Sequence, residues 1–86
     1  MGGPPYSTVT LAIPEPVTEE KIANILKELK ENDVHLEEDS RNENDVVFKY
    51  AKRTPEDRKR MADLFESWLN ASEPAIEIES YRMVEN

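Results

Sequence analysis

Cysteine is absent from this 86-residue chain, and glycine occurs only at Gly2 and Gly3. Without cysteine the chain has no disulfide framework, zinc knuckle or iron–sulfur site. Average glycine usage would give about six residues. The shortage excludes the phosphate-binding loops GxxxxGK[ST] and GxGxxG, whose backbone geometry needs glycine. Enzymes that bind nucleotides through such loops are therefore removed from consideration.

A long apolar run is also missing, and no basic segment precedes an apolar stretch. We therefore expect neither a transmembrane helix nor a signal peptide, which makes the cytoplasm the default location. The chain has 19 acidic and 11 basic residues, a net charge of −8, and 35% charged residues, which indicates a strongly solvated surface. The length predicts one domain over residues 1–86, with a disordered tail at 1–5 and a frayed end at 84–86.

Four segments alternate apolar and polar side chains with period two, at residues 6–13, 34–39, 45–52 and 75–83. Two segments have a helical period, and each follows a threonine suited to an N-cap, Thr18 and Thr54. The order βαββαβ predicts an α+β fold of the ferredoxin-like plait type. Such a fold has a four-stranded antiparallel sheet in the order 4-1-3-2 and both helices on one face.

The pattern also predicts which side of each strand faces the helices. In the third strand Phe48 and Tyr50 should face inward, because burying the opposite face would bury Lys49. In the last strand Ile76 and Ile78 should face inward.

With glycine scarce, left-handed backbone positions should be filled by asparagine or aspartate. The candidates are Asn32, Asn42, Asn44 and Asn70, and Asn32 is expected to end the first helix.

The uncovered sheet face is the candidate protein-binding surface. We expect it to be mostly acidic, with Glu37 beside Lys49 and with Tyr6 and Tyr81 as cross-strand neighbours. Its candidate residues are Tyr6, Thr8, His35, Glu37, Asp39, Lys49, Glu77, Glu79 and Tyr81.

Nucleic-acid binding is not expected. The aromatic residues of the third strand are predicted to face the core, where bases cannot stack on them. The net charge of −8 also opposes phosphate binding. A local basic cluster leaves one alternative open, a weak anion site at Lys52, Arg53 and Arg58 near the start of the second helix.

Catalytic and metal sites have little support in the sequence. The single histidine, His35, has no cysteine to activate and no serine placed beside it by pattern. His35, Glu37 and Asp39 would be strung about 7 Å apart along a strand, and so would not converge on one metal ion. We therefore predict no enzyme activity, no cofactor and no metal.

Two functional hypotheses remain. The first is a small acidic interaction module, regulatory or inhibitory, that uses its open sheet face. Its partner would be a protein, either basic or packed against the sheet, and the chain itself would be a monomer or weak dimer. The alternative is a computationally designed or redesigned ferredoxin-like scaffold without an evolved function, because capping and alternation agree throughout the chain.

Overall fold

The computed structural model describes residues 6–51 and 54–84. Within these ranges the chain forms four strands and two helices: β1 (Tyr6–Ala12), α1 (Glu19–Glu31), β2 (Glu37–Arg41), β3 (Asp45–Ala51), α2 (Pro55–Asn70) and β4 (Ser80–Val84). The expected tail at 1–5 and the last two residues of the chain lie outside this part, whereas Val84 is the final residue of β4. Neither helix described here is long and apolar enough to cross a membrane.

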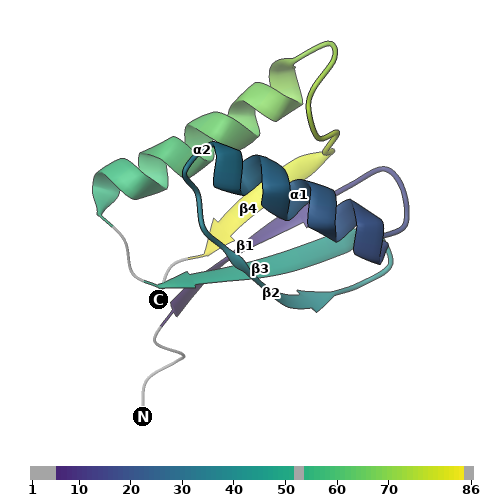
Figure 1. Ribbon diagram of the computed structural model, residues 1–86, viewed down its shortest axis with the longest axis horizontal. Coiled ribbons are helices and arrows are strands. Elements are labelled where there is room, and N and C mark those ends of the chain that lie inside the picture. The colour runs from purple at the N-terminus through teal and green to yellow at the C-terminus, as the bar shows by residue number, and fades with distance from the viewer. Residues whose placement is uncertain (1–5, 52–53, 85–86) are drawn as a thin grey trace.

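The strands form an antiparallel sheet in the order β2-β3-β1-β4, which is the predicted order read from the other edge. Both helices lie on the same face of this sheet (Figure 1). The predicted βαββαβ α+β architecture is therefore confirmed. Because β1 and β3 are central, their side chains away from the helices form the middle of the uncovered face.

The helices begin where the sequence predicts. The Thr18 Oγ1 accepts a hydrogen bond from the backbone N–H of Lys21 at 3.1 Å, and the Thr54 Oγ1 accepts one from Asp57 at 3.2 Å. Each bond satisfies a backbone donor that has no partner within the first helical turn. Pro55 at the start of α2 has no N–H to satisfy.

The core lies between the helices and the sheet. Phe48 is fully buried and Tyr50 is 3% exposed, so the prediction that the aromatic face of the third strand points inward is correct. Phe65 and Trp68 of α2 pack edge to face, with ring centroids 5.5 Å apart. Fifteen hydrophobic residues are buried in the described part of the chain: Val9, Leu11, Ile13, Ile22, Ile25, Leu29, Val34, Val46, Phe48, Tyr50, Met61, Phe65, Trp68, Ile76 and Ile78.

The left-handed position after α1 is one residue later than predicted. Asn32 caps the helix at φ −102°, and Asp33 has φ 63°. Among the described residues Asp33 is the only non-glycine residue with positive φ, so the remaining candidates are wrong: Asn42, Asn44 and Asn70. The Asn32 side chain instead donates a hydrogen bond to the carbonyl of Glu28 at 2.8 Å, which uses its amide within the last turn.

The second strand begins at Glu37 rather than at Val34. Residues 34–36 connect α1 to β2, and Val34 is buried there without joining the sheet. The pairing of β2 with β3 also shifts register between Glu38 and Ser40. Such a shift inserts one extra residue into β2, and an extra residue interrupts the alternation of side chains along a strand. The predicted alternation therefore does not extend to Asp39.

The last strand is shorter than predicted, and its side chains face the opposite sides of the sheet from those predicted. β4 begins at Ser80, and Tyr81 pairs with the inward-facing Leu11. Tyr81 therefore faces α2, where its ring lies 5.5 Å from that of Phe65. Ile76 and Ile78 are buried, as predicted, but in the irregular segment that precedes the strand.

Candidate interaction surface

The side chains of the sheet that point away from the helices form three rows across the strands. The register places in the first row Glu37, Lys49, Thr8 and Val84; in the second row Ser40, Val47, Thr10 and Arg82; and in the third row Asp45, Ala12 and Ser80. These eleven residues are called the open face below. Its central members, Thr8, Thr10, Ala12, Val47 and Lys49, are partly exposed, and Val84 is 42% exposed.

The open face is electrically balanced, so the expectation of a mostly acidic face is wrong. Its described acids are Glu37 and Asp45, and its described bases are Lys49 and Arg82. The remaining members are threonine, serine, valine and alanine. A chain with a net charge of −8 thus has a face of small and β-branched side chains with no net charge.

Three of the predicted face residues lie side by side in the first row. Glu37 is directly opposite Lys49, as expected, and Lys49 is directly opposite Thr8. Side chains in such positions are about 5 Å apart at their Cβ atoms. Tyr6 is the first residue of β1 and pairs with Ala51, and only its backbone lies in the described part.

Tyr81 and the acids before β4 do not belong to the open face. The Tyr81 hydroxyl donates a 2.7 Å hydrogen bond to the carboxylate of Glu66 on α2, so no Tyr6–Tyr81 patch forms on the uncovered side. Glu77 and Glu79 are exposed in the segment before β4. The backbone N–H of Glu79 donates to the carbonyl of Ala12 at 2.6 Å, which holds that segment against the end of β1.

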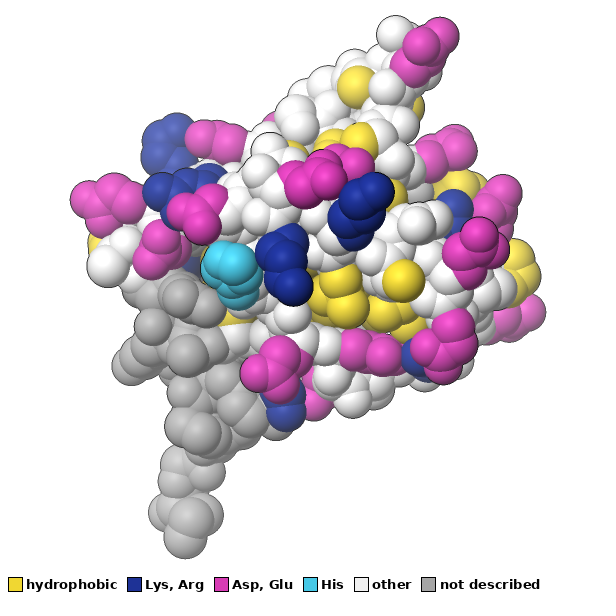
Figure 2. Space-filling view, in the orientation of Figure 1, with side chains coloured by type: hydrophobic (Ala, Val, Ile, Leu, Met, Phe, Trp, Pro, Cys, Tyr) yellow, Lys and Arg dark blue, Asp and Glu magenta, His cyan; other side chains and the backbone are white. Residues whose placement is uncertain are grey.

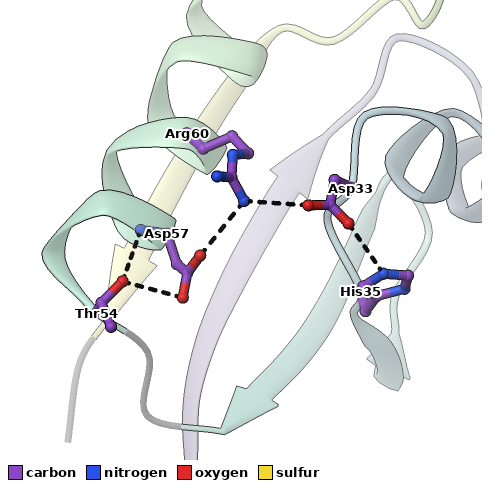
Figure 3. A network of polar contacts seen from close by, with 5 residues as sticks. All are labelled: Asp33, His35, Thr54, Asp57 and Arg60. Atoms are coloured by element: carbon purple, nitrogen blue, oxygen red, sulfur yellow. Dashed lines mark hydrogen bonds and ion pairs between the residues drawn. The ribbon is translucent and has the colours of Figure 1, made fainter.

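His35 lies on the side of the helices rather than on the open face. Its Nε2 is 3.5 Å from Oδ1 of Asp33, and the other carboxylate oxygen of Asp33 is 3.5 Å from Arg60 of α2 (Figure 3). Arg60 also contacts Asp57 at 3.4 Å. The hollow lined by these residues has a volume of about 30 Å³, which suits a water molecule and not a substrate or cofactor.

The acidic second strand contains an arginine that pairs with one of its glutamates. Arg41 donates hydrogen bonds to both carboxylate oxygens of Glu38, at 2.7 and 3.1 Å, and lies 3.2 Å from Glu19 of α1. The hydrogen bonds that Arg41 donates to Glu38 and to Glu19 raise the pKa of Arg41 above its ordinary value. Asp39 is exposed at the register shift of β2 and is not in the rows of the open face.

The predicted anion site is only partly within the described residues, because Lys52 and Arg53 lie outside them. Arg58 is partly exposed in the first turns of α2 and has an interaction partner. The same turns carry Asp57, whose carboxylate is 3.1 Å from the Thr54 hydroxyl at the N-cap. A carboxylate at this position occupies the end of the helix dipole that an anion would use.

The helical side of the molecule mixes both signs of charge. Acidic and basic side chains alternate over it (Figure 2), and Lys59 pairs with Asp63 at 3.0 Å one helical turn away. Ion pairs of this kind are typical of a solvated helix surface and contribute little to stability. In this view the described residues therefore show no continuous patch of one sign to a basic partner.

Arg82 and Val84 belong to the open face and were not among the residues predicted for it. The sequence did carry a signal for them. Tyr81 and Met83 also alternate with polar residues, and both pair with inward-facing residues of β1. If Tyr81 and Met83 are taken as the inward-facing residues of the last strand, Arg82 and Val84 must face outward.

Comparison with protein-family models, with curated proteins and with solved structures found no match to this chain.

Proposed function

We propose that this chain is a non-enzymatic protein-interaction module, regulatory or inhibitory, whose partner packs against the open face. One observation carries the proposal: a chain of net charge −8 has an uncovered sheet face with two acids, two bases and otherwise small or β-branched side chains. Charged residues are depleted at the centre of protein interfaces. The two central positions of the middle row, Val47 and Thr10, fit that description.

Of the two kinds of partner expected from the sequence, the balanced charge favours the one that packs on the sheet over the basic one. A basic partner would gain little from a face without net charge. A second sheet or an apolar helix face would instead bury Val47 and Val84 and could satisfy the threonine hydroxyls at its rim. The candidate residues Thr8, Glu37 and Lys49 would then form one border of the contact.

The test compares proteins captured from a lysate of the source organism by three forms of the chain. Val47→Glu adds a charge at the centre of the open face, whereas Leu69→Glu adds one at a 36% exposed position of α2. We expect a specific partner to be lost with Val47→Glu and retained with Leu69→Glu, each variant first shown by circular dichroism to be folded. Capture that is equal for both variants would place the contact elsewhere and would overturn the proposal.

A further inference from the structure

The layout of charges on the open face is complementary to itself. Lys49 is in the first row of β3 and Asp45 is in the third row of the same strand, with Val47 between them in the middle row. A rotation by 180° about the middle row turns the face over and exchanges the first and third rows. Lys49 of one copy then lies over Asp45 of the other, and the symmetry repeats this pair.

We infer that the open face binds a second copy of this chain, sheet against sheet, about a two-fold axis that runs along its middle row. This inference rests on the proposed function, since it names the partner of the same face. The resulting contact is isologous, as in most symmetric dimers. Its centre pairs Val47 with Val47 and Thr10 with Thr10, and two Lys49–Asp45 pairs flank that centre.

The alternative two-fold axis, along the strands, lacks these pairs. It would place β3 of one copy over β1 of the other, so that Lys49 would face Thr8 and Arg82 would face Ser40. The chosen axis brings the two Arg82 side chains together, but β4 is an edge strand. A long arginine side chain at an edge can turn its guanidinium into solvent. The charge layout therefore selects the axis across the strands.

The dimer should be weak. Four strands spaced about 4.8 Å apart, and three rows spaced about 7 Å apart, give a face of roughly 400 Å². Two such faces bury roughly 800 Å² in total, which is less than the roughly 1,200 Å² of stable specific interfaces and is expected of a weak, transient contact. The net charge of −8 on each copy adds repulsion, and salt screens it.

Salt dependence separates this dimer from a complex with a basic partner. Raising the ionic strength from about 0.01 M to about 0.15 M shortens the Debye length from roughly 30 Å to roughly 8 Å. Repulsion between two chains of net charge −8 involves many more charges than two Lys49–Asp45 pairs. We therefore expect the dimer to become several-fold tighter with salt, whereas a complex held by opposite net charges would weaken.

The decisive experiment exchanges the charges. Sedimentation equilibrium would be measured on the full chain at protein concentrations up to about 1 mM, where a weak dimer is populated. Lys49→Glu changes the net charge from −8 to −10 and Asp45→Lys changes it to −6, so the variants are compared at about 0.15 M salt, which screens this difference. Lys49→Glu places Glu over Asp45 twice, and Asp45→Lys places Lys over Lys49 twice. Under that condition each variant alone should dimerise about tenfold more weakly or worse. An equimolar mixture of the two should associate again, because every pair across the axis then has opposite charges.

Leu69→Glu, on the far side of the molecule, should dimerise like the unmodified chain. A chain that stays monomeric under all these conditions would overturn the inference about the second copy. The proposed function would survive that result if a foreign protein were still captured in a manner sensitive to Val47→Glu. A dimer that ignores both Val47→Glu and the charge exchange would overturn the inference and would show that self-association uses another surface.

Discussion

Asp33 combines an unusual backbone conformation with two side-chain contacts. Its φ of 63° turns the chain after α1 towards β2, and its carboxylate lies 3.5 Å from both His35 and Arg60. Aspartate tolerates the left-handed region better than most residues with a Cβ, and glycine tolerates it best. The chain has no glycine beyond residue 3. At the single left-handed position among the described residues, aspartate therefore takes the place that glycine most often fills.

Two substitutions separate the backbone effect from the contacts. Asp33→Ala and Asp33→Gly both remove the carboxylate, and only Asp33→Ala keeps a Cβ at positive φ. We expect Asp33→Ala to be less stable than Asp33→Gly by about 1 kcal/mol in the free energy of unfolding, measured by urea denaturation. If the alanine variant were the more stable of the two, the left-handed conformation of this residue in solution would be in doubt.

At the scale of elements, one hydrogen bond joins β4 to α2. The Tyr81 hydroxyl donates to the carboxylate of Glu66 at 2.7 Å, and the Tyr81 ring packs against Phe65. The hydrogen bond, followed by burial and the negative charge of Glu66, raises the pKa of Tyr81 above its ordinary value of 10.0. The folded chain therefore holds this proton more tightly than the unfolded chain does.

Tyr81→Phe should lower the free energy of unfolding by about 0.5–1 kcal/mol at pH 7, which is less than a buried hydrogen bond to a charged group contributes because this bond is exposed to solvent. The contribution of Tyr81 is fully present below the pKa of an unfolded tyrosine and is lost as the pH rises through the raised pKa of the folded state. Urea denaturation at several pH values should therefore show the variant and the unmodified chain converging above pH 10.0. A gap that stays constant to high pH would contradict the assigned hydrogen bond.

The same elements show what could be predicted from the sequence. Helix starts depend on neighbouring residues, and the Thr18 and Thr54 caps were predictable because each acts on an N–H three residues later. The orientation of β4 depends on a distant partner. Ile76 and Ile78 continue an alternating pattern without belonging to the strand. The sequence therefore offers two possible phases, and the pairing of Tyr81 with Leu11 decides between them.

The residues of the open face could be predicted only where the alternation of their strand is regular. Thr8 and Lys49 lie in strands whose alternation is regular, and both are on the open face as expected. His35 and Asp39 were assigned to it on the assumption of an unbroken second strand. That strand begins at Glu37 and shifts register after Glu38, a feature for which period-two alternation gives no signal.

At the scale of the whole molecule, thermal stability distinguishes the interaction module from the designed-scaffold alternative. Idealised designs avoid non-glycine residues at positive φ and tend to be hyperstable, whereas this chain has Asp33 at φ 63° and a register shift in β2. We expect a melting temperature in the mesophilic range, about 45–65 °C, by circular dichroism. A melting temperature above about 90 °C would favour the scaffold.

The central place of β1 in the sheet has a consequence for the biosynthesis of this protein. Thr8 pairs with Lys49 on one side and with Val84 on the other, so β1 leaves the ribosome well before the strands with which it pairs. Contacts between residues so far apart in the chain slow folding relative to a helical protein of similar size. Until β4 has emerged, the nascent chain keeps one edge of β1 unpaired, which is the state in which a chaperone would find a strand to protect.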